Sequence, residues 1–237
     1  MQKITPHLWF DKEAKEAAAF YVSVFGDPAV TVPITLDAKT KINNVTTLHN
    51  TPSGDCDIVS FELAGQPFMA ISAGPYFKFN PSISFSIACK TKEEVDLFWS
   101  KLSKGGKVLM ELGAYPFSER YGWIQDKYGL SWQILSMGNV DIKQKITPVI
   151  MYVGDVCGKA EEAINFYVSL FKKSKVGDIF RYPKGQAPDK EGTIAHTFFT
   201  LEGQEFAAMD SAREHKFTFS EAISLIVNCK DQKEIDY

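Results

Sequence analysis

The side chains in this sequence that could do chemistry are spaced without any complete catalytic motif. No two cysteines form a CxxC pair, so the sequence predicts neither a zinc ribbon nor a dithiol redox site. The cysteines are Cys56, Cys89, Cys157 and Cys229. The histidines are equally dispersed, at His7, His49, His196 and His215. A catalytic or metal centre would therefore have to be assembled by the fold from residues that are distant in the chain.

Serine and carboxylate side chains give two further candidates. Ser84 and Ser224 occupy equivalent places in a repeat, but neither has a His and an Asp in a recognisable nucleophile arrangement. Glu62 and Glu111 lie in expected strands, where either carboxylate could act as a general base if it faces a cavity. Whether any of these side chains can take part in catalysis depends on the strands and helices that hold them.

An internal duplication is the clearest feature of the chain. Lys3-Ile4-Thr5-Pro6 recurs as Lys145-Ile146-Thr147-Pro148, and later segments recur in the same order. The later matching segments are 20–25 with 166–171, 63–68 with 201–206, and 83–90 with 223–230. Because the order never changes, the chain contains two copies of one unit. We expect the copies at residues 1–137 and 145–237, joined by a linker at 138–144.

Hydrophobic periodicity assigns an α+β fold to these copies. Residues 13–25 carry an apolar stripe at helical spacing, and Thr91 with Glu94 has the spacing of a capping box for a helix that ends near Leu102. Short strand-like segments flank both helices. The expected strands are 4–10, 45–48, 58–63, 68–72, 83–89, 108–112, 121–126 and 132–135. Residues 1–137 thus read as two βαβββ modules, which we expect to form one curved, mostly antiparallel sheet around a shared cavity.

The second copy is expected to be incomplete. It contains a third βαβββ module, but its fourth module has only the strand 223–229 and residues 231–237. Nothing in it matches residues 105–135. Such a half-domain would expose apolar sheet, so we expect either a C-terminally shortened chain or a neighbouring chain that covers the surface. The second reading predicts a homodimer.

Five blocks resemble the PhnB-like branch of the vicinal oxygen chelate superfamily, which includes glyoxalases, bleomycin-resistance proteins and extradiol dioxygenases. Sequence collections often label this branch 3-demethylubiquinone-9 3-methyltransferase. The blocks are 4–10, 17–21, 77–85, 93–102 and 121–133. The resemblance implies a glyoxalase-like fold but no particular reaction. Methyl transfer is not expected, because the sequence lacks the glycine-rich strand-to-helix loop of adenosyl-dependent methyltransferases.

The resemblance also implies where a divalent metal would bind. Enzymes of the superfamily hold Zn, Ni, Mn or Fe with His and Glu side chains from the first and last strands of paired modules. Transferred to this sequence, those positions give His7 and Gln133 as the only polar candidates besides Ser84. With one imidazole, one amide and no carboxylate, we expect no metal site, and the alternative is a weak one at His7 and Gln133.

A ligand cavity is the other expectation. If alternate strand residues face inward, the walls combine aromatic and apolar groups with a few polar points, as small-molecule sites do. The expected lining residues are His7, Trp9, Phe61, Met69, Ser84, Trp123, Trp132 and Gln133. The competing interpretation is that these aromatic residues fill the core between sheet and helices.

Composition limits the partners. The formal charge is −3 over 237 residues, without the basic cluster that nucleic-acid binding requires. No apolar run reaches the length of a membrane helix, and the N-terminus lacks a secretory signal, so we expect a cytoplasmic protein.

The leading functional hypothesis is therefore a small-molecule binding protein that needs no cofactor. The first alternative is a metal-dependent isomerase, lyase or dioxygenase. The second is that the degenerate second copy mediates dimerisation while the first binds the ligand.

Overall fold

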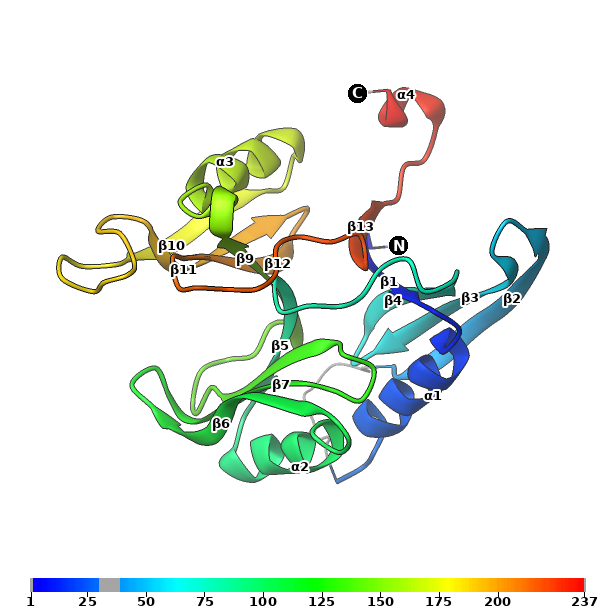
Figure 1. The fold of residues 1–237 in the computed structure, drawn as a ribbon, viewed down its shortest axis with the longest axis horizontal. Helices are drawn as coiled ribbons and strands as arrows, with labels where there is room; N and C mark the ends of the chain where they lie inside the picture. Colours follow the sequence, from blue (N-terminus) through cyan, green and yellow to red (C-terminus); the bar gives the residue numbers. More distant parts are fainter. Residues whose placement is uncertain (1, 30–38, 237) are drawn as a thin grey trace. The chain divides into compact units, whose positions relative to one another are not determined.

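The computed structural model describes residues 2–29 and 39–236, which form two compact units. The first unit comprises residues 1–78 and 221–237, and the second comprises residues 79–220. Each unit is an α+β structure with a single sheet, and helices α1, α2 and α3 pack on the sheets of their units (Figure 1).

The first unit contains a five-stranded sheet of order β13-β1-β4-β3-β2. Its strands are β1 (Ile4–Phe10), β2 (Lys41–Thr51), β3 (Gly54–Leu63), β4 (Gln66–Ser72) and β13 (Ile223–Val227). Helix α1 (Ala14–Phe25) covers one face, where Tyr21 and Phe25 pack into a core with Leu8 and Phe68. The short α4 (Gln232–Ile235) follows β13. The last strand segment, β13, therefore lies beside the first strand of the chain (Figure 1).

The second unit contains an eight-stranded sheet of order β10-β11-β12-β9-β5-β8-β7-β6. Its first half is built from β5 (Ile83–Cys89), β6 (Lys107–Tyr115), β7 (Ser118–Gln125) and β8 (Ser131–Ser136). Its second half is built from β9 (Ile146–Val153), β10 (Lys175–Arg181), β11 (Ile194–Leu201) and β12 (Gln204–Ser211). Helices α2 (Lys92–Leu102) and α3 (Ala160–Leu170) pack on the same face, and a short 3₁₀ turn, Gly154–Val156, precedes α3.

Local sequence signals explain the helix boundaries. Thr91 caps α2 by accepting a hydrogen bond from the Glu94 backbone N–H at 3.2 Å, which confirms the predicted start. The Glu94 carboxylate accepts from the Lys90 N–H rather than from Thr91, at 2.7 Å. Helix α1 ends at Phe25, the last residue of the predicted apolar stripe, and Gly26 follows it.

The pairing of modules differs from the expectation for residues 1–137. The first strand of the second module, β5, pairs with β9 of the third module, and β1 pairs with β13 of the fourth. The strands of residues 1–137 are thus divided between two sheets and do not share one. The physical reason is that all four first strands have the same apolar sequence pattern and present equivalent edges, so the repeat alone does not fix which edges meet.

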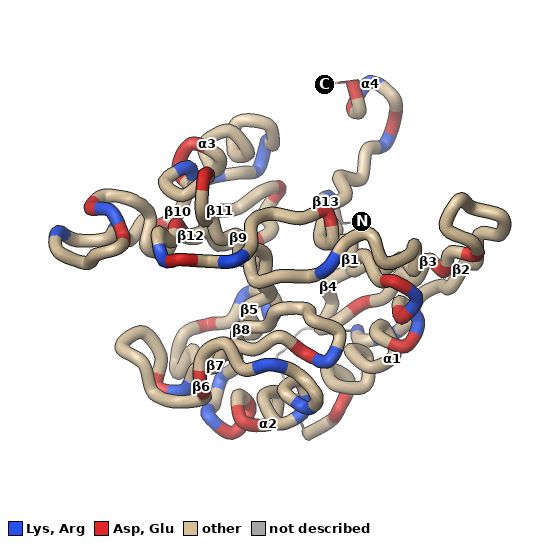
Figure 2. Tube along the Cα trace, viewed as in Figure 1, with Lys and Arg blue, Asp and Glu red and all other residues tan. Residues whose placement is uncertain are grey.

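Charge is dispersed over both units. Lys and Arg alternate with Asp and Glu along the chain, without a basic stripe (Figure 2). None of the helices in the described residues is long and apolar enough to cross a membrane.

Candidate functional site

Helices α2 and α3 cover one face of the eight-stranded sheet. The candidate site lies on the other face. Strand alternation sends Phe85, Ile87 and Ile134 under the helices, where all three are fully buried. The residues between them, including Ser84 and Gln133, face the opposite side. The seam between β5 and β9 runs through the middle of this open face.

One row of residues crosses the seam. Ser84 lies opposite Val149, and Val149 lies opposite Ala207. On the other side, the Gln133 amide donates to the Ser84 hydroxyl at 2.8 Å. The row Gln133–Ser84–Val149–Ala207 therefore occupies the first and last strands of the two paired modules.

The polar end of this row is internally hydrogen-bonded. The Tyr121 hydroxyl donates to Gln133 Oε1 at 3.0 Å, and Gln133 Nε2 then donates to Ser84. Tyr121 and Ser84 are almost fully buried, and burial raises the pKa of the Tyr121 phenol, so it stays protonated at neutral pH. Trp123, on the same face, donates its indole N–H to Ser131 at 2.8 Å.

The first unit has an equivalent row on its open face. His7 of β1 lies between Met69 of β4 and Ser224 of β13 in register. His7 Nδ1 is 3.4 Å from the Ser224 hydroxyl, and burial lowers the pKa of the imidazole, which favours its neutral form. Trp9 lies one step further along β1, where its indole donates to the Gly74 carbonyl and its ring contacts Phe77.

Two of the predicted cavity residues point the other way. Phe61 packs on Phe68 on the side of the first sheet that α1 covers, with no exposed surface. Trp132 lies beside Phe85 on the α2 side, and its indole donates to Asp126 at 2.8 Å. Both are core residues. The error was one of strand phase, because aromatic residues occur on both faces of these strands.

The remaining predicted residues fall into two separate groups. His7, Trp9 and Met69 lie on the open face of the first sheet, and Ser84, Trp123 and Gln133 lie on that of the second. The proposed pairing of His7 with Gln133 therefore joins residues of different sheets.

A cavity of about 500 Å³ adjoins the Gln133 row in the second unit. Ser86 and Thr147, which flank the seam, contribute to its floor, and Ser86 is in register with Gln133. Leu135, Ile142 and Phe198 supply apolar wall. The charged residues that line it are Asp141, Lys143, Lys175, Asp178 and Glu205. None of the eight residues predicted from the sequence lines this cavity.

The segment expected to be a linker forms one wall. Gln144 is fixed against β12, since its amide donates to the Glu205 carbonyl at 2.8 Å and accepts from the Glu205 N–H at 2.9 Å. Ile142 is buried beside it. Met137, where the segment begins, donates its N–H to the Cys89 carbonyl at 2.7 Å. Hydrogen bonds therefore hold both ends of the wall to the sheet.

The sequence did not predict this wall, because residues 138–144 have the polar composition of an ordinary linker between domains. The available signal was Ile142, an isolated apolar residue in a polar segment, which indicates burial against the sheet.

The residues at the row positions do not fit the divalent metal that glyoxalase-type enzymes use. In the second unit they offer an amide, a hydroxyl and two aliphatic side chains, and the two polar groups already bond to each other. In the first unit they offer His7, Met69 and Ser224 without a carboxylate. Among the residues that the structure describes, no three His, Cys, Asp or Glu side chains gather into a metal-binding group.

The family model for 3-demethylubiquinone-9 3-methyltransferase matches residues 2–135 and 144–237 of this chain. The chain belongs to this family. The two matched ranges correspond closely to the two copies of the repeat. A Bacillus cereus structure described as a putative 3-demethylubiquinone-9 3-methyltransferase, PhnB protein, is 38% identical. The match covers 57% of this chain and 99% of that one, with a TM-score of 0.49.

A likeness in fold extends over both copies. Glyoxalase I from Zea mays has a TM-score of 0.55 at 13% identity, over 91% of this chain and 71% of that one. This likeness to glyoxalase I concerns the fold alone. A search of curated proteins found no match.

Proposed function

We propose that this PhnB-like protein binds a small molecule in the cavity of its second unit, and that binding does not require a metal ion. The cavity itself carries the proposal. Its volume of about 500 Å³ lies within the range of small-molecule sites, roughly 300–1,000 Å³.

The lining favours a ligand with an apolar body and a polar end. Leu135, Ile142 and Phe198 provide apolar contact, while Ser86 and Thr147 offer hydroxyl groups for orientation. Lys143 and Lys175 lie at the charged part of the lining and could meet an anionic substituent. Because the Gln144 wall is already hydrogen-bonded to β12, little ordering is needed on binding, which favours affinity.

Metal independence rests on the donor set. Near the seam, the positions to which the resemblance assigns metal ligands carry Gln133, Ser84 and Val149, and Gln133 and Ser84 are hydrogen-bonded to each other. A divalent cation would have to break that hydrogen bond and would gain only neutral donors.

The test is a fluorescence titration with 8-anilinonaphthalene-1-sulfonate, which joins apolar rings to an anion. The wild-type protein should bind it saturably at one site, with and without chelator. Ala88→Trp, which fills the floor, should weaken binding at least about 10-fold, the equivalent of 1.4 kcal/mol.

Ala114→Trp on β6 is the matched control, because Ala114 is exposed and does not line the cavity. It should bind the probe as the wild type does. Equal binding by Ala88→Trp and wild type, with both proteins folded by near-ultraviolet circular dichroism, would refute the cavity as the site.

A further inference from the structure

Three residues on neighbouring strands form a charged row in the cavity of the second unit. Lys175 of β10 lies opposite Thr200 of β11, and Thr200 lies opposite Glu205 of β12. All three line the cavity. Phe199 and Phe206 stack on each other and are buried on the side that α3 covers, so strand alternation sends Thr200 and Glu205 to the open face. Lys175 lies there too, because residues directly opposite each other on paired strands share a face.

The two charges of this row are not paired within the protein. In the part of the chain that the structure describes, neither Lys175 nor the Glu205 carboxylate forms an ion pair or a side-chain hydrogen bond, and Gln144 bonds only the backbone of Glu205. Arg181, the other basic residue of β10, pairs with Glu161 through two contacts of 2.7 Å. The row therefore offers one cation and one anion to a ligand.

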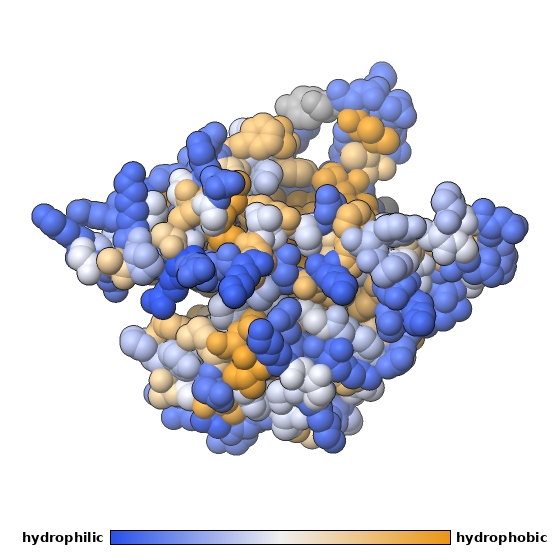
Figure 3. All heavy atoms as spheres, in the orientation of Figure 1, coloured by the Kyte–Doolittle hydropathy of each residue, from blue (hydrophilic) through white to orange (hydrophobic). Residues whose placement is uncertain are grey.

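Other charged groups lie beside the row or far from it. Asp141 and Lys143 line the cavity wall and carry opposite charges. Asp178 lies within a register shift of β10, about 10 Å along the strand from Lys175. The hydrophilic loop 182–193 joins β10 to β11 at the opposite end of both strands (Figure 3), about 20 Å from the row. A ligand on the row would therefore meet Lys175 and the Glu205 carboxylate first.

The spacing of the row matches a compact zwitterion. Adjacent strands lie about 4.8 Å apart, so the side chains of Lys175 and Glu205 leave the sheet at points about 10 Å apart. An ammonium group and a carboxylate on one carbon span about 3 Å, and a charge-assisted hydrogen bond of about 2.8 Å on each side extends this to about 9 Å. Thr200 lies in the middle of the row, where its hydroxyl can donate to the carboxylate. A ligand with both charges on one carbon therefore reaches both ends of the row.

Phe198 supplies apolar contact beside the row. It lies two residues before Thr200 on the same face of β11, lines the cavity and is 43% exposed. Two residues along a strand correspond to about 7 Å. A large apolar side chain on the carbon that bears the two charges extends far enough to pack on this ring.

We propose that the ligand of this cavity is a free α-amino acid with an aromatic or large aliphatic side chain, a proposal that rests on the small-molecule binding proposed above. The ammonium group of the ligand pairs with Glu205. Its carboxylate pairs with Lys175 and accepts a hydrogen bond from Thr200, and its side chain packs on Phe198. Full affinity needs both charges, because a ligand that lacks one leaves an end of the row without a partner.

Isothermal titration calorimetry with three matched probes tests the proposal. L-phenylalanine carries both charges, 3-phenylpropanoate lacks the ammonium group, and 2-phenylethylamine lacks the carboxylate. The wild-type protein should bind L-phenylalanine at least about 10-fold more tightly than it binds either of the other two probes, because only L-phenylalanine makes both charge-assisted contacts.

Two variants assign the two charges. Lys175→Met should weaken the binding of L-phenylalanine about 10-fold and should not weaken that of 2-phenylethylamine. Glu205→Gln should weaken the binding of L-phenylalanine about 10-fold and should not weaken that of 3-phenylpropanoate. Lys107→Met is the matched control, because Lys107 also begins an exposed edge strand and does not line the cavity. This control should bind all three probes as the wild type does.

The possible failures can be told apart, provided that near-ultraviolet circular dichroism shows each variant to be folded. Equal affinity for the three probes would overturn the proposal, and so would equal losses of L-phenylalanine affinity in Lys175→Met and Lys107→Met. If 8-anilinonaphthalene-1-sulfonate still occupies the cavity in that case, the assigned ligand class alone is wrong. If neither this dye nor any of the three probes binds, the proposed function fails as well.

Discussion

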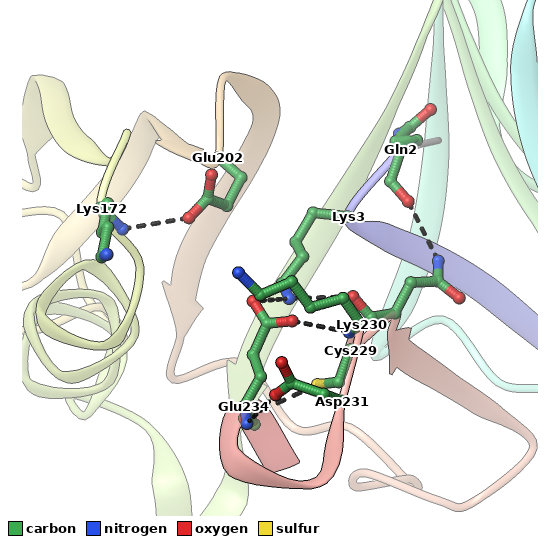
Figure 4. Close-up of polar contacts among 9 residues, drawn as sticks. Gln2, Lys3, Lys172, Glu202, Cys229, Lys230, Asp231 and Glu234 are labelled. Atoms are coloured by element: carbon green, nitrogen blue, oxygen red, sulfur yellow. Dashed lines mark hydrogen bonds and ion pairs between the residues drawn. The ribbon is translucent and has the colours of Figure 1, made fainter.

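Lys3 and Glu234 form an ion pair of 2.7 Å (Figure 4), and this pair repeats the one formed by Lys145 and Glu94. In each pair, the lysine precedes a first strand, and the glutamate lies in the first turn of the helix that follows the neighbouring first strand. The glutamate also accepts a backbone N–H in both cases, from Lys230 and from Lys90, at 2.7 Å. The same lysine–glutamate ion pair thus occurs twice in the fold, once beside the β1–β13 strand pair and once beside the β5–β9 strand pair.

The second of these pairs predicts a large effect on stability. Lys145 and Glu94 are 8% and 3% exposed, and the lysine also donates to the Ala88 carbonyl at 2.6 Å. Lys145→Met leaves the Glu94 carboxylate buried without its cation, which should cost about 3–5 kcal/mol of unfolding free energy. Urea denaturation followed by circular dichroism measures the loss.

Lys3→Met is the matched control for that variant. Lys3 and Glu234 are 21% and 34% exposed, so solvent screens the pair and the loss should be clearly smaller. Equal losses in the two variants would show that the buried ion pair at β5–β9 contributes no more to stability than the more exposed ion pair at β1–β13.

The affinity of the protein for divalent metal ions should depend on the side chains at Ser84, Gln133 and Val149, which lie at the junction of β5 and β9. Addition of Zn²⁺ or Ni²⁺ should leave the melting temperature of the wild type unchanged. The combined substitutions Ser84→His, Val149→His and Gln133→Glu place two imidazoles and a carboxylate on neighbouring register positions, and this variant should gain stability from the same ions. Elemental analysis before and after chelation checks both proteins. Stoichiometric metal in the wild type would restore the metal-dependent enzyme as the better account.

Stability should fall as the pH decreases below the ordinary pKa of histidine. Burial of the His196 ring in β11 lowers the pKa of the imidazole in the folded protein below its ordinary value of 6.5. The unfolded chain therefore binds the proton on His196 more readily than the folded protein does. The contribution of the neutral imidazole to folding stability is complete above pH 6.5, and it is lost as the pH falls through the pKa of His196 in the folded protein. His196→Gln should reduce the difference in urea midpoint between about pH 7.5 and about pH 5.5. If the urea midpoint of His196→Gln changes with pH as much as that of the wild type, the His196 ring does not contribute to the pH dependence of stability.

Much of the fold could be predicted from local patterns. The strand at Ile83–Cys89 lies within the predicted bounds, and the Thr91–Glu94 spacing located the start of α2 correctly. Both signals depend on neighbouring residues in the chain. Sheet order is different, because it depends on which of several similar edges meet. Both β1 and β9 begin with the same Ile-Thr-Pro segment, and each follows a lysine.

The candidate site was harder to predict for a related reason. Whether Trp132 or Gln133 faces the helices depends on the phase of one strand, and an aromatic residue fits either face. The alternation of Trp132 and Ile134 with Ser131 and Gln133 was the signal that could have fixed it. The cavity wall at Gln144 could not be found this way, because it depends on a contact with β12.

The central claim is that the cavity of the second unit holds the ligand, and an amide chemical-shift map of the labelled protein tests it most directly. During titration with 8-anilinonaphthalene-1-sulfonate in the presence of chelator, the amides of Ser86, Gln144 and Thr147 should shift together and saturate. Shifts confined to exposed apolar residues outside the cavity, such as Phe166 on α3, or shifts that never saturate, would contradict the account.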